Sequence, residues 1–379
     1  MTPTYSDDHL TLVSAVRDFA RAELLERDRA WDRAEESCCT HLAPVYNMGL
    51  MGLRVPEESG GLAVPMLPYG HIIRELAWAS PSVAVTVGVH NMGAEIVKTF
   101  ARPAVRDALL PKLVEPGNLC TFAISEPNAG SDAAAARTRA ERVAGGYRIS
   151  GSKMWVTNGI NGRWCMVMAR LGDTGTKQDL TMFLMDLQLP QIKRVPIHGK
   201  MGIRASETAE MSLDGAFVPE ENMLGEPGWG MRIGLSALDG GRIGIGSQAI
   251  GIATAALDIM SAYAKQREVF GKPIADYQAI QWMIADTSVE IAAAQQLVDR
   301  AAWLKDSGRP FTQEASMAKL YASETAGRAV DRGVQIHGGY GYVHEFRIEQ
   351  LYRDARITRI YEGTSEIQRV VIARGLLKE

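Results

Sequence analysis

The chain has few of the features that mark secreted, metal-binding or nucleic-acid-binding proteins. Its 379 residues include four cysteines, and the adjacent Cys38 and Cys39 have neither the spacing of a disulfide framework nor that of a CxxC redox motif. The seven histidines show no metal-binding spacing. A formal net charge of −3 provides no positive field for nucleic acid. We therefore expect no metal and no nucleic-acid partner.

Long apolar runs and targeting signals are also scarce. We find no apolar run of the length needed to span a membrane. Residues 1–12 are polar and acidic, unlike a signal peptide or a basic transit peptide. Together with the low cysteine content, this favours a reducing compartment. We predict a cytoplasmic protein with no membrane partner.

What the chain does have is enough length for two or three domains. Helical periodicity dominates residues 1–117, short strand-like runs separated by turn signals fill residues 118–226, and long helical stretches return in residues 227–379. Strands that do not alternate with helices are typical of a small barrel or sandwich and not of a parallel sheet. The pattern predicts a mainly α fold with an N-terminal helical domain, a central β-barrel or sandwich, and a C-terminal domain like a four-helix bundle.

The first long helix of the C-terminal segment, expected over residues 229–265, is unusually rich in glycine. Gly240 and Gly241 are adjacent, and five further glycines lie in the same stretch. Each costs up to about 1 kcal/mol relative to alanine in a helix. Two explanations remain open: close packing of a neighbouring helix through small residues, or close approach of a ligand.

A short loop near the C-terminus carries Glu362 and Gly363. Ser365 and Gln368 have the spacing of a capping box that opens a last helix. A carboxylate just before a helix, beside a glycine that lets a ligand come close, suits a positioned general base. The same carboxylate would also favour the positive end of that helix without any catalytic role.

Five motifs occur in an order and at intervals that resemble those of the acyl-CoA dehydrogenases, a family of FAD-dependent enzymes with the same helical, β and helical order. The motifs occupy residues 123–132, 153–158, 267–273, 335–342 and 352–366. The resemblance runs from about residue 6 to the end of the chain. The C-terminal part is most similar to short-chain members that act on butyryl-CoA.

The resemblance implies an FAD site. The residues it assigns to the cofactor are Phe122, Ile124, Ser125, Gly130, Ser131, Trp155, Thr157, Arg267, Phe270, Gln278, Gln335, Gly338, Gly339, Thr364 and Glu366. Trp155 would lie against the flavin ring, and Arg267 would pair with the pyrophosphate of an FAD bound by a neighbouring subunit. Taken singly, Trp155 would more simply fill the β core, and Arg267 would form a surface salt bridge.

The resemblance makes Glu362 the general base that removes the α-proton of an acyl-CoA as a hydride passes from the β-carbon to FAD. The residues it assigns to the substrate are Ser131, Asp239, Arg242 and Gly363. Burial in an apolar pocket is expected to raise the pKa of Glu362. Some relatives place the base on the long helix, where this chain has Gly241, so a glutamate introduced there is expected to restore some turnover to a Glu362→Gln variant.

Partners and alternatives follow from the same resemblance. It implies a short- or medium-chain acyl-CoA substrate, electron-transferring flavoprotein as the electron acceptor, and a homotetramer. The alternatives are an acyl-thioester oxidase or a flavin monooxygenase on the same fold, a dehydrogenase for an acyl group bound to a carrier protein, and a non-redox protein with a vestigial pocket. The presence of Glu362 argues against the monooxygenases, and an intact set of cofactor residues argues against the vestigial pocket.

Two residues depart from the family pattern, and a third is a charged residue within an apolar stretch. Val269 stands where relatives have a polar residue, and Gln350 occupies a position that is usually basic. Glu95 lies within an apolar helical stretch. We expect it on an exposed helix face. If it pointed inward, it would predict a short or polar acyl chain.

Overall fold

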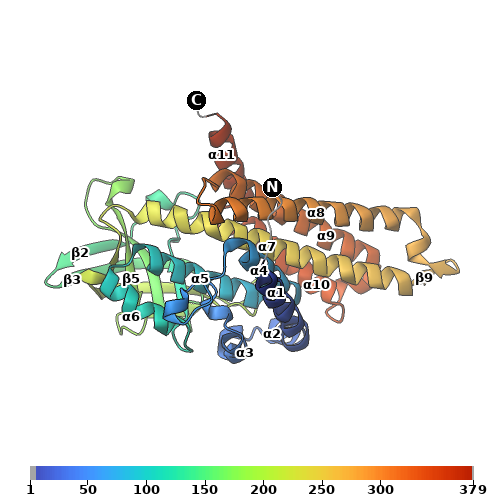
Figure 1. Ribbon diagram of the computed structural model, residues 1–379, viewed down its shortest axis with the longest axis horizontal. Helices are drawn as coiled ribbons and strands as arrows, with labels where there is room; N and C mark the ends of the chain where they lie inside the picture. The colour runs from blue at the N-terminus through green and yellow to red at the C-terminus, as the bar shows by residue number, and fades with distance from the viewer. Residues whose placement is uncertain (1–5, 378–379) are drawn as a thin grey trace.

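The computed structural model describes residues 6–377, which form helical, β and helical parts in chain order (Figure 1). The side chain of Ser6 accepts a hydrogen bond from the backbone of His9 and so caps the first helix, as the sequence predicts. A π-helical segment, Ala20–Leu24, joins this helix to the second. The helices of this part are α1 (Asp7–Phe19), α2 (Leu25–Ala34), α3 (Ala43–Asn47), α4 (Met66–Ala79), α5 (Pro81–Phe100) and α6 (Pro103–Leu113).

The central part is an eight-stranded sheet in the order β6-β7-β3-β2-β4-β5-β8, with β1 paired to β4. The strands are β1 (Cys120–Ala123), β2 (Arg139–Val143), β3 (Gly146–Thr157), β4 (Trp164–Arg170), β5 (Leu180–Asp186), β6 (Ile192–Pro196), β7 (Thr208–Pro219) and β8 (Met223–Leu224). All pairs are antiparallel except those of β4 with β1 and β2. The predicted class of the central part is therefore confirmed.

The sequence did not predict every strand. The strand-like runs of the sequence lie at residues 122–125, 147–150, 153–157, 164–168 and 180–185. They correspond to β1, β4 and β5 and to two pieces of β3, whose pairing with β7 has two register irregularities. Strands β2, β6, β7 and β8 were missed. Strand β7 alternates between buried and exposed positions, but its glycine, serine and acidic residues hide that alternation in the sequence.

The C-terminal part contains the long helices that the sequence predicts. They are α7 (Gly230–Gln266), α8 (Gln278–Asp306), α9 (Thr312–His337), α10 (Arg347–Ala355) and α11 (Ser365–Leu376), with a short hairpin of β9 (Glu268–Val269) and β10 (Lys272–Pro273) between the first two. Helix α7 runs from the β part to the far end of the molecule, where β9 lies (Figure 1).

Helix α7 corrects one expectation from the sequence. By length and composition it is apolar enough to cross a membrane, with a mean hydropathy of 1.4 over its most apolar window. However, 78% of that window is buried inside the protein, where α7 packs against α4, α5, α8 and α9. Its apolar character is that of a core helix.

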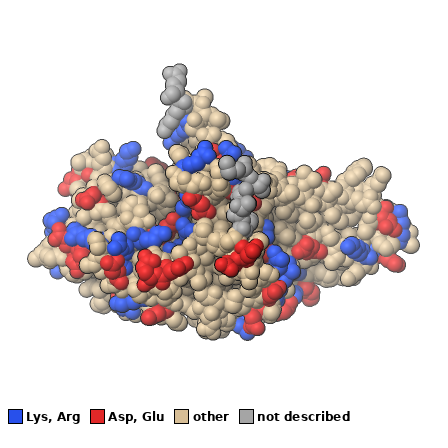
Figure 2. Space-filling model, in the orientation of Figure 1, with Lys and Arg blue, Asp and Glu red and all other residues tan. Residues whose placement is uncertain are grey.

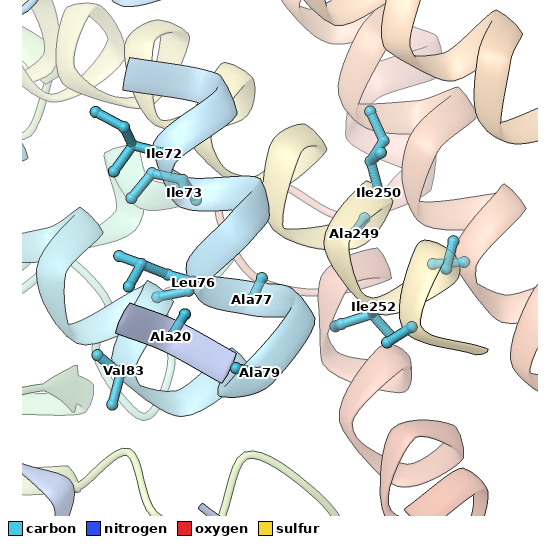
Figure 3. Close-up of a cluster of buried hydrophobic side chains, with 14 of the residues drawn as sticks. Ala20, Ile72, Ile73, Leu76, Ala77, Ala79, Val83, Ala249, Ile250 and Ile252 are labelled. Atoms are coloured by element: carbon cyan, nitrogen blue, oxygen red, sulfur yellow. The ribbon is translucent and has the colours of Figure 1, made fainter. Parts of the chain in front are cut away.

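The main core lies between α4 and α7. Ile72, Ile73 and Leu76 of α4 are buried, as are Ala249 and Ile250 of α7 (Figure 3). A Cβ atom at Gly251 would lie 2.4 Å from the backbone oxygen of Arg74, so this glycine lets the two helices approach closely. Helix packing therefore explains part of the glycine content of α7.

Candidate active site

A cavity of about 210 Å³ lies between α4, α5, α7 and the loop before α11. Most of its lining is apolar, and its members include Ile73, Val85, Val89, Met92, Ile96, Phe100, Ile245 and Phe311. Glu362 lines this cavity, and so does Glu95. The expectation that Glu95 lies on an exposed helix face is therefore wrong.

The Glu362 loop has an unusual backbone conformation that neighbouring side chains hold in place. Glu362 itself is in the left-handed region, with φ of 51°. The ammonium of Lys319 donates to the backbone oxygen of Gly363 at 2.7 Å. The side-chain amide of Gln368 donates to the backbone oxygens of Gly363 (2.8 Å) and Glu362 (3.2 Å). The loop is thus tied to α9 and α11.

The predicted capping box is wrong by one residue. Thr364, and not Ser365, is the N-cap of α11, and its hydroxyl accepts from the backbone N–H of Ile367 at 3.3 Å. The hydroxyl of Ser365 donates to Glu324 instead. The amide of Gln368 is engaged with the Glu362 loop, so it serves the site and does not serve as a cap.

The carboxylate of Glu362 is poised to take up a proton. Its Oε2 atom is buried and makes no hydrogen bond within the described part of the chain. Burial raises its pKa to about 7, and the positive charges of Lys319 and Arg242 oppose that rise only in part. A carboxylate with a pKa near neutrality is a suitable general base.

Gly241 explains why this carboxylate can lie against α7. A Cβ atom at position 241 would be 1.9 Å from the Oε2 atom of Glu362, so any side chain there would displace the base. Gly240 and Gly241 both line the cavity. At these two positions the glycines of α7 leave room for the site, whereas at Gly251 they serve helix packing.

Arg242 and Asp239 form a buried network beside the cavity. Arg242 is 3% exposed and lies 2.5 Å from the carboxylate of Asp239. It also donates to the hydroxyl of Ser316, and Thr312 donates to Asp239. Neither Asp239 nor Arg242 lines the cavity, so the predicted influence of Arg242 on the local field is visible here and its predicted substrate contact is not.

A second group of predicted site residues gathers at the edge of the β part. The backbone N–H of Met154 donates to the backbone oxygen of Ser125 at 2.9 Å, which places the loop after β1 beside Trp155. A buried ion pair between Lys153 and Glu126, at 2.8 Å, strengthens this link. Lys153 also donates to the backbone oxygen of Ile124.

Trp155 is presented outward on this edge. It has φ of 60° and is 61% exposed, which excludes the alternative that it fills the β core. Thr157, two residues further along β3, is partly exposed. Gly130 and Ser131 are exposed in the loop after β1, and a Cβ atom at Gly130 would meet nothing within 4 Å. This edge therefore offers a flat apolar ring, a hydroxyl and open backbone to a ligand.

Phe122 connects the edge of the β part to the cavity. It packs in a small apolar cluster with Val85 and Val89 of α5 and with Tyr361, the residue before the candidate base. Val85 and Val89 also line the cavity. These side chains would therefore lie between a ligand bound against Trp155 and a ligand bound in the cavity.

A third group of predicted cofactor residues lies elsewhere. Arg267, Gln335, Gly338 and Gly339 line a separate groove of about 790 Å³ at the end of α7. Phe270 is 93% exposed, and Gln278 is also exposed. Helix α7 has 37 residues. Ile124 of the β edge lies against Gly234, near the start of α7, whereas Arg267 follows its last residue. At 1.5 Å per residue the helix between them is about 50 Å long, far more than the length of a dinucleotide.

These two groups fit FAD if each serves a different cofactor molecule. The β edge supplies an exposed aromatic wall and hydrogen-bonding groups for a flavin ring, and the groove supplies a cationic side chain and glycine backbone for a pyrophosphate. Thr364 and Glu366 lie at the start of α11, close in sequence to the base and outside both groups. Their predicted contact with the cofactor stays a prediction.

Two lysines of the site were missed by the sequence analysis. Lys319 and Lys153 are both fully buried, and each is tied to a residue of a motif. Lys319 lies among alanine and serine residues on the buried face of α9. A lysine on an otherwise small and buried helix face was the available signal, because such a charge is almost never buried without a partner.

Comparison with known proteins agrees with the geometry. Three family models match in chain order: the N-terminal domain of acyl-CoA dehydrogenase over residues 6–116, the middle domain over residues 121–216, and the C-terminal domain over residues 228–377. The chain is 41% identical over 365 residues to the probable acyl-CoA dehydrogenase YngJ of Bacillus subtilis (strain 168), covering 96% of each chain.

Two further proteins are similar over nearly their whole length. The chain is 39% identical to the mitochondrial short-chain specific acyl-CoA dehydrogenase of Bos taurus, covering 98% of this chain and 90% of that one. The structure matches that of butyryl-CoA dehydrogenase from Megasphaera elsdenii with a TM-score of 0.97, at 36% identity and full coverage of both chains. The chain therefore belongs to the acyl-CoA dehydrogenase family, whose members are FAD-dependent oxidoreductases that act on CH–CH groups.

Proposed function

We propose that the protein oxidises a short- or medium-chain acyl-CoA to the trans-2-enoyl thioester, with Glu362 as the general base. One observation carries this proposal. The carboxylate of Glu362 lies in an apolar cavity with an unpartnered oxygen and a pKa of about 7. A base in that state can remove a weakly acidic proton next to a thioester carbonyl at neutral pH.

The residues of this chain have separate tasks in the reaction. The Oε2 atom of Glu362 takes the proton from the α-carbon, and its own backbone N–H is the proposed donor to the thioester oxygen, on which negative charge develops. FAD bound at the β edge would supply the acceptor for the hydride that leaves the β-carbon. Lys319 and Gln368 hold the loop, so that the carboxylate stays against Gly241 while the proton moves.

The family resemblance further supports electron-transferring flavoprotein as the acceptor that reoxidises the cofactor, and a homotetramer as the working form. The low cysteine content supports a reducing, cytoplasmic location. The separation of the two cofactor groups along α7 supports an oligomer, because one chain cannot bring both to a single FAD. Exposed apolar side chains on α8, including Trp282 (63%) and Val289 (68%), support a partner surface there. The same arm of the molecule carries little charge in Figure 2.

An anaerobic titration tests the activity. The purified, yellow protein is mixed with butyryl-CoA, and the visible flavin band is recorded. Bleaching supports acyl-CoA oxidation. If the flavin band persists with butyryl-, hexanoyl- and octanoyl-CoA, the proposed function is wrong. Reoxidation of the bleached protein by air, faster than by electron-transferring flavoprotein, would show an oxidase instead.

A further inference from the structure

The cavity carries charged side chains besides Glu362. Glu95 of α5 accepts from Arg54 at 3.2 Å and from the ammonium of Lys305, in the last turn of α8, at 2.9 Å. All three side chains line the same cavity as Glu362. A dehydrogenase for plain alkyl chains needs only apolar surface at this position, because a terminal methyl group cannot satisfy a charge.

The charged cluster lies close to the base. The ammonium of Lys305 is 2.7 Å from the Cβ position of Gly240, and the Oε2 atom of Glu362 is 1.9 Å from the Cβ position of Gly241. Because neighbouring Cα atoms are 3.8 Å apart, the ammonium and the carboxylate are no more than roughly 11 Å from each other. With a contact distance at each end, this limit leaves room between them for an acyl chain of no more than roughly six carbons.

The cluster has more positive than negative charge. Arg54 and Lys305 face one carboxylate, and the Nε atom of Arg54 is buried without a hydrogen-bond partner in the described chain. Lys98 on α5 lies near them, and burial together with the charge of Arg54 lowers its pKa. Buried charge that is not balanced is costly, so a ligand that supplies an acceptor would be stabilised.

Tyr69 adds a neutral donor to the same cavity. Its side chain is 5% exposed and lines the cavity, with the guanidinium of Arg54 5.9 Å from the ring centre. Its hydroxyl forms no hydrogen bond to any residue between 6 and 377, although buried tyrosine hydroxyls usually find a partner. The cavity thus holds a free phenolic donor besides its cations.

We propose that the preferred substrate is a thioester of a short acyl chain that ends in a polar oxygen group, a carboxylate or a hydroxyl, bound by Lys305, Arg54 and Tyr69. This inference rests on the proposed function and names its substrate class. Lys305 and Arg54 would donate to the terminal oxygen, and the net positive charge favours a carboxylate. Glu95 would hold the two cations in place and accept from a terminal hydroxyl.

The test compares matched thioesters on the FAD-containing protein. Butyryl-, 4-hydroxybutyryl- and succinyl-CoA form one series, and valeryl-, 5-hydroxyvaleryl- and glutaryl-CoA form the other. We expect kcat/KM for a polar-ended substrate to exceed that of its methyl-ended counterpart by about tenfold to a hundredfold, as for a hydrogen bond to a charged group. The hydroxyl and carboxylate members show which oxygen group is preferred.

Two variants link the preference to the cluster. Lys305→Met is expected to lower kcat/KM for the polar-ended substrates more than for their methyl-ended counterparts, and so to remove most of the preference. Lys112→Met, the same change on an exposed face of α6, is expected to leave the preference unaltered. Glu95→Gln removes the negative charge, so kcat/KM should rise for the carboxylate-ended substrates and fall for the hydroxyl-ended ones. This second variant keeps the test decisive if Lys305→Met does not fold.

The outcomes separate the two proposals. If butyryl-CoA bleaches the flavin and the methyl-ended chains are equal or better substrates, the inference is wrong and the proposed function stands. The same holds if Lys305→Met lowers turnover of all substrates equally. If no thioester of either series reduces the flavin, the inference is wrong, and the proposed function is wrong as well only if hexanoyl- and octanoyl-CoA also fail.

Discussion

Two glutamates that line one cavity have opposite properties. Burial would raise the pKa of each. At Glu362 the effect of burial prevails, because the nearby cations are not paired with its carboxylate and the Oε2 atom has no hydrogen-bond partner in the described chain. Its pKa is about 7. At Glu95 the ion pairs with Arg54 and Lys305 outweigh burial, and the pKa is about 2. The contrast teaches that contact with a cation, and not burial alone, decides whether a carboxylate in this cavity holds a proton.

The largest expected effect comes from removing the proton acceptor. Glu362→Gln should lower the rate of flavin reduction by butyryl-CoA about 1,000-fold while FAD stays bound, because the amide cannot take the α-proton. Stopped-flow absorbance measures the rate, and the flavin spectrum measures the cofactor. Glu115→Gln, at an exposed position, is the matched control. A variant that retained wild-type rate would remove Glu362 from the mechanism.

A second variant would supply the base from position 241 of α7 instead of from the Glu362 loop. Because the Cβ position of residue 241 coincides with the Glu362 carboxylate, a glutamate there needs Glu362 replaced by glycine. Glu362→Gly with Gly241→Glu is expected to recover at least about tenfold over Glu362→Gly alone, since a base returns to the cavity. The geometry corrects the simpler design that starts from Glu362→Gln, because the amide of that variant would occupy the space of the new side chain. Equal rates in the glycine single and double variants would contradict this expectation.

A third change would raise the pKa of Glu362 still further above that of Glu95. Lys319→Met removes the strongest opposing charge, so the pKa of Glu362 should rise above about 7. The acid limb of the pH profile of kcat/KM, which reports the deprotonated base, should move to higher pH, with a loss of several-fold at pH 7 and recovery in alkali. A uniform loss at every pH would indicate that Lys319 only holds the loop.

The smallest effect is on stability. The folded pKa of Glu362 is raised above its ordinary 4.5, so the stability it contributes as a neutral group is present below about pH 4.5 and is lost as the pH rises through 7. Glu362→Gln should therefore be more stable than the wild type at pH 8.5, by up to about 3 kcal/mol, and similar to it at pH 5.

Glu95→Gln provides the opposite case in the same denaturation experiments. The folded pKa of Glu95 is lowered, so its contribution is present above pH 4.5 and is lost only as the pH falls through about 2. The variant should be less stable than the wild type by the same amount at pH 5 and pH 8.5. If stability depended on pH in the same way in the two variants, the two glutamates would not differ as described.

Much of the fold was readable from the sequence because its signals are local. Helical periodicity and the Ser6 cap predicted the helices, and Glu362 could be singled out from its loop and motif. Strand β7 was missed because its alternation is carried by small and acidic residues. The cap of α11 was misplaced by one residue because Thr364 and Ser365 are equally good caps, and contacts with Glu324 and the Glu362 loop decide between them.

The sequence by itself determined the order of the three parts, the family motifs and the residue proposed as the base. The tertiary structure alone decided what surrounds each charge. It turned Glu95 inward against Arg54 and Lys305, placed Lys319 under the Glu362 loop, and set Arg267 far from Trp155. A pKa depends on burial and on charges within a few ångströms, and these come from segments remote in sequence, which no local pattern records.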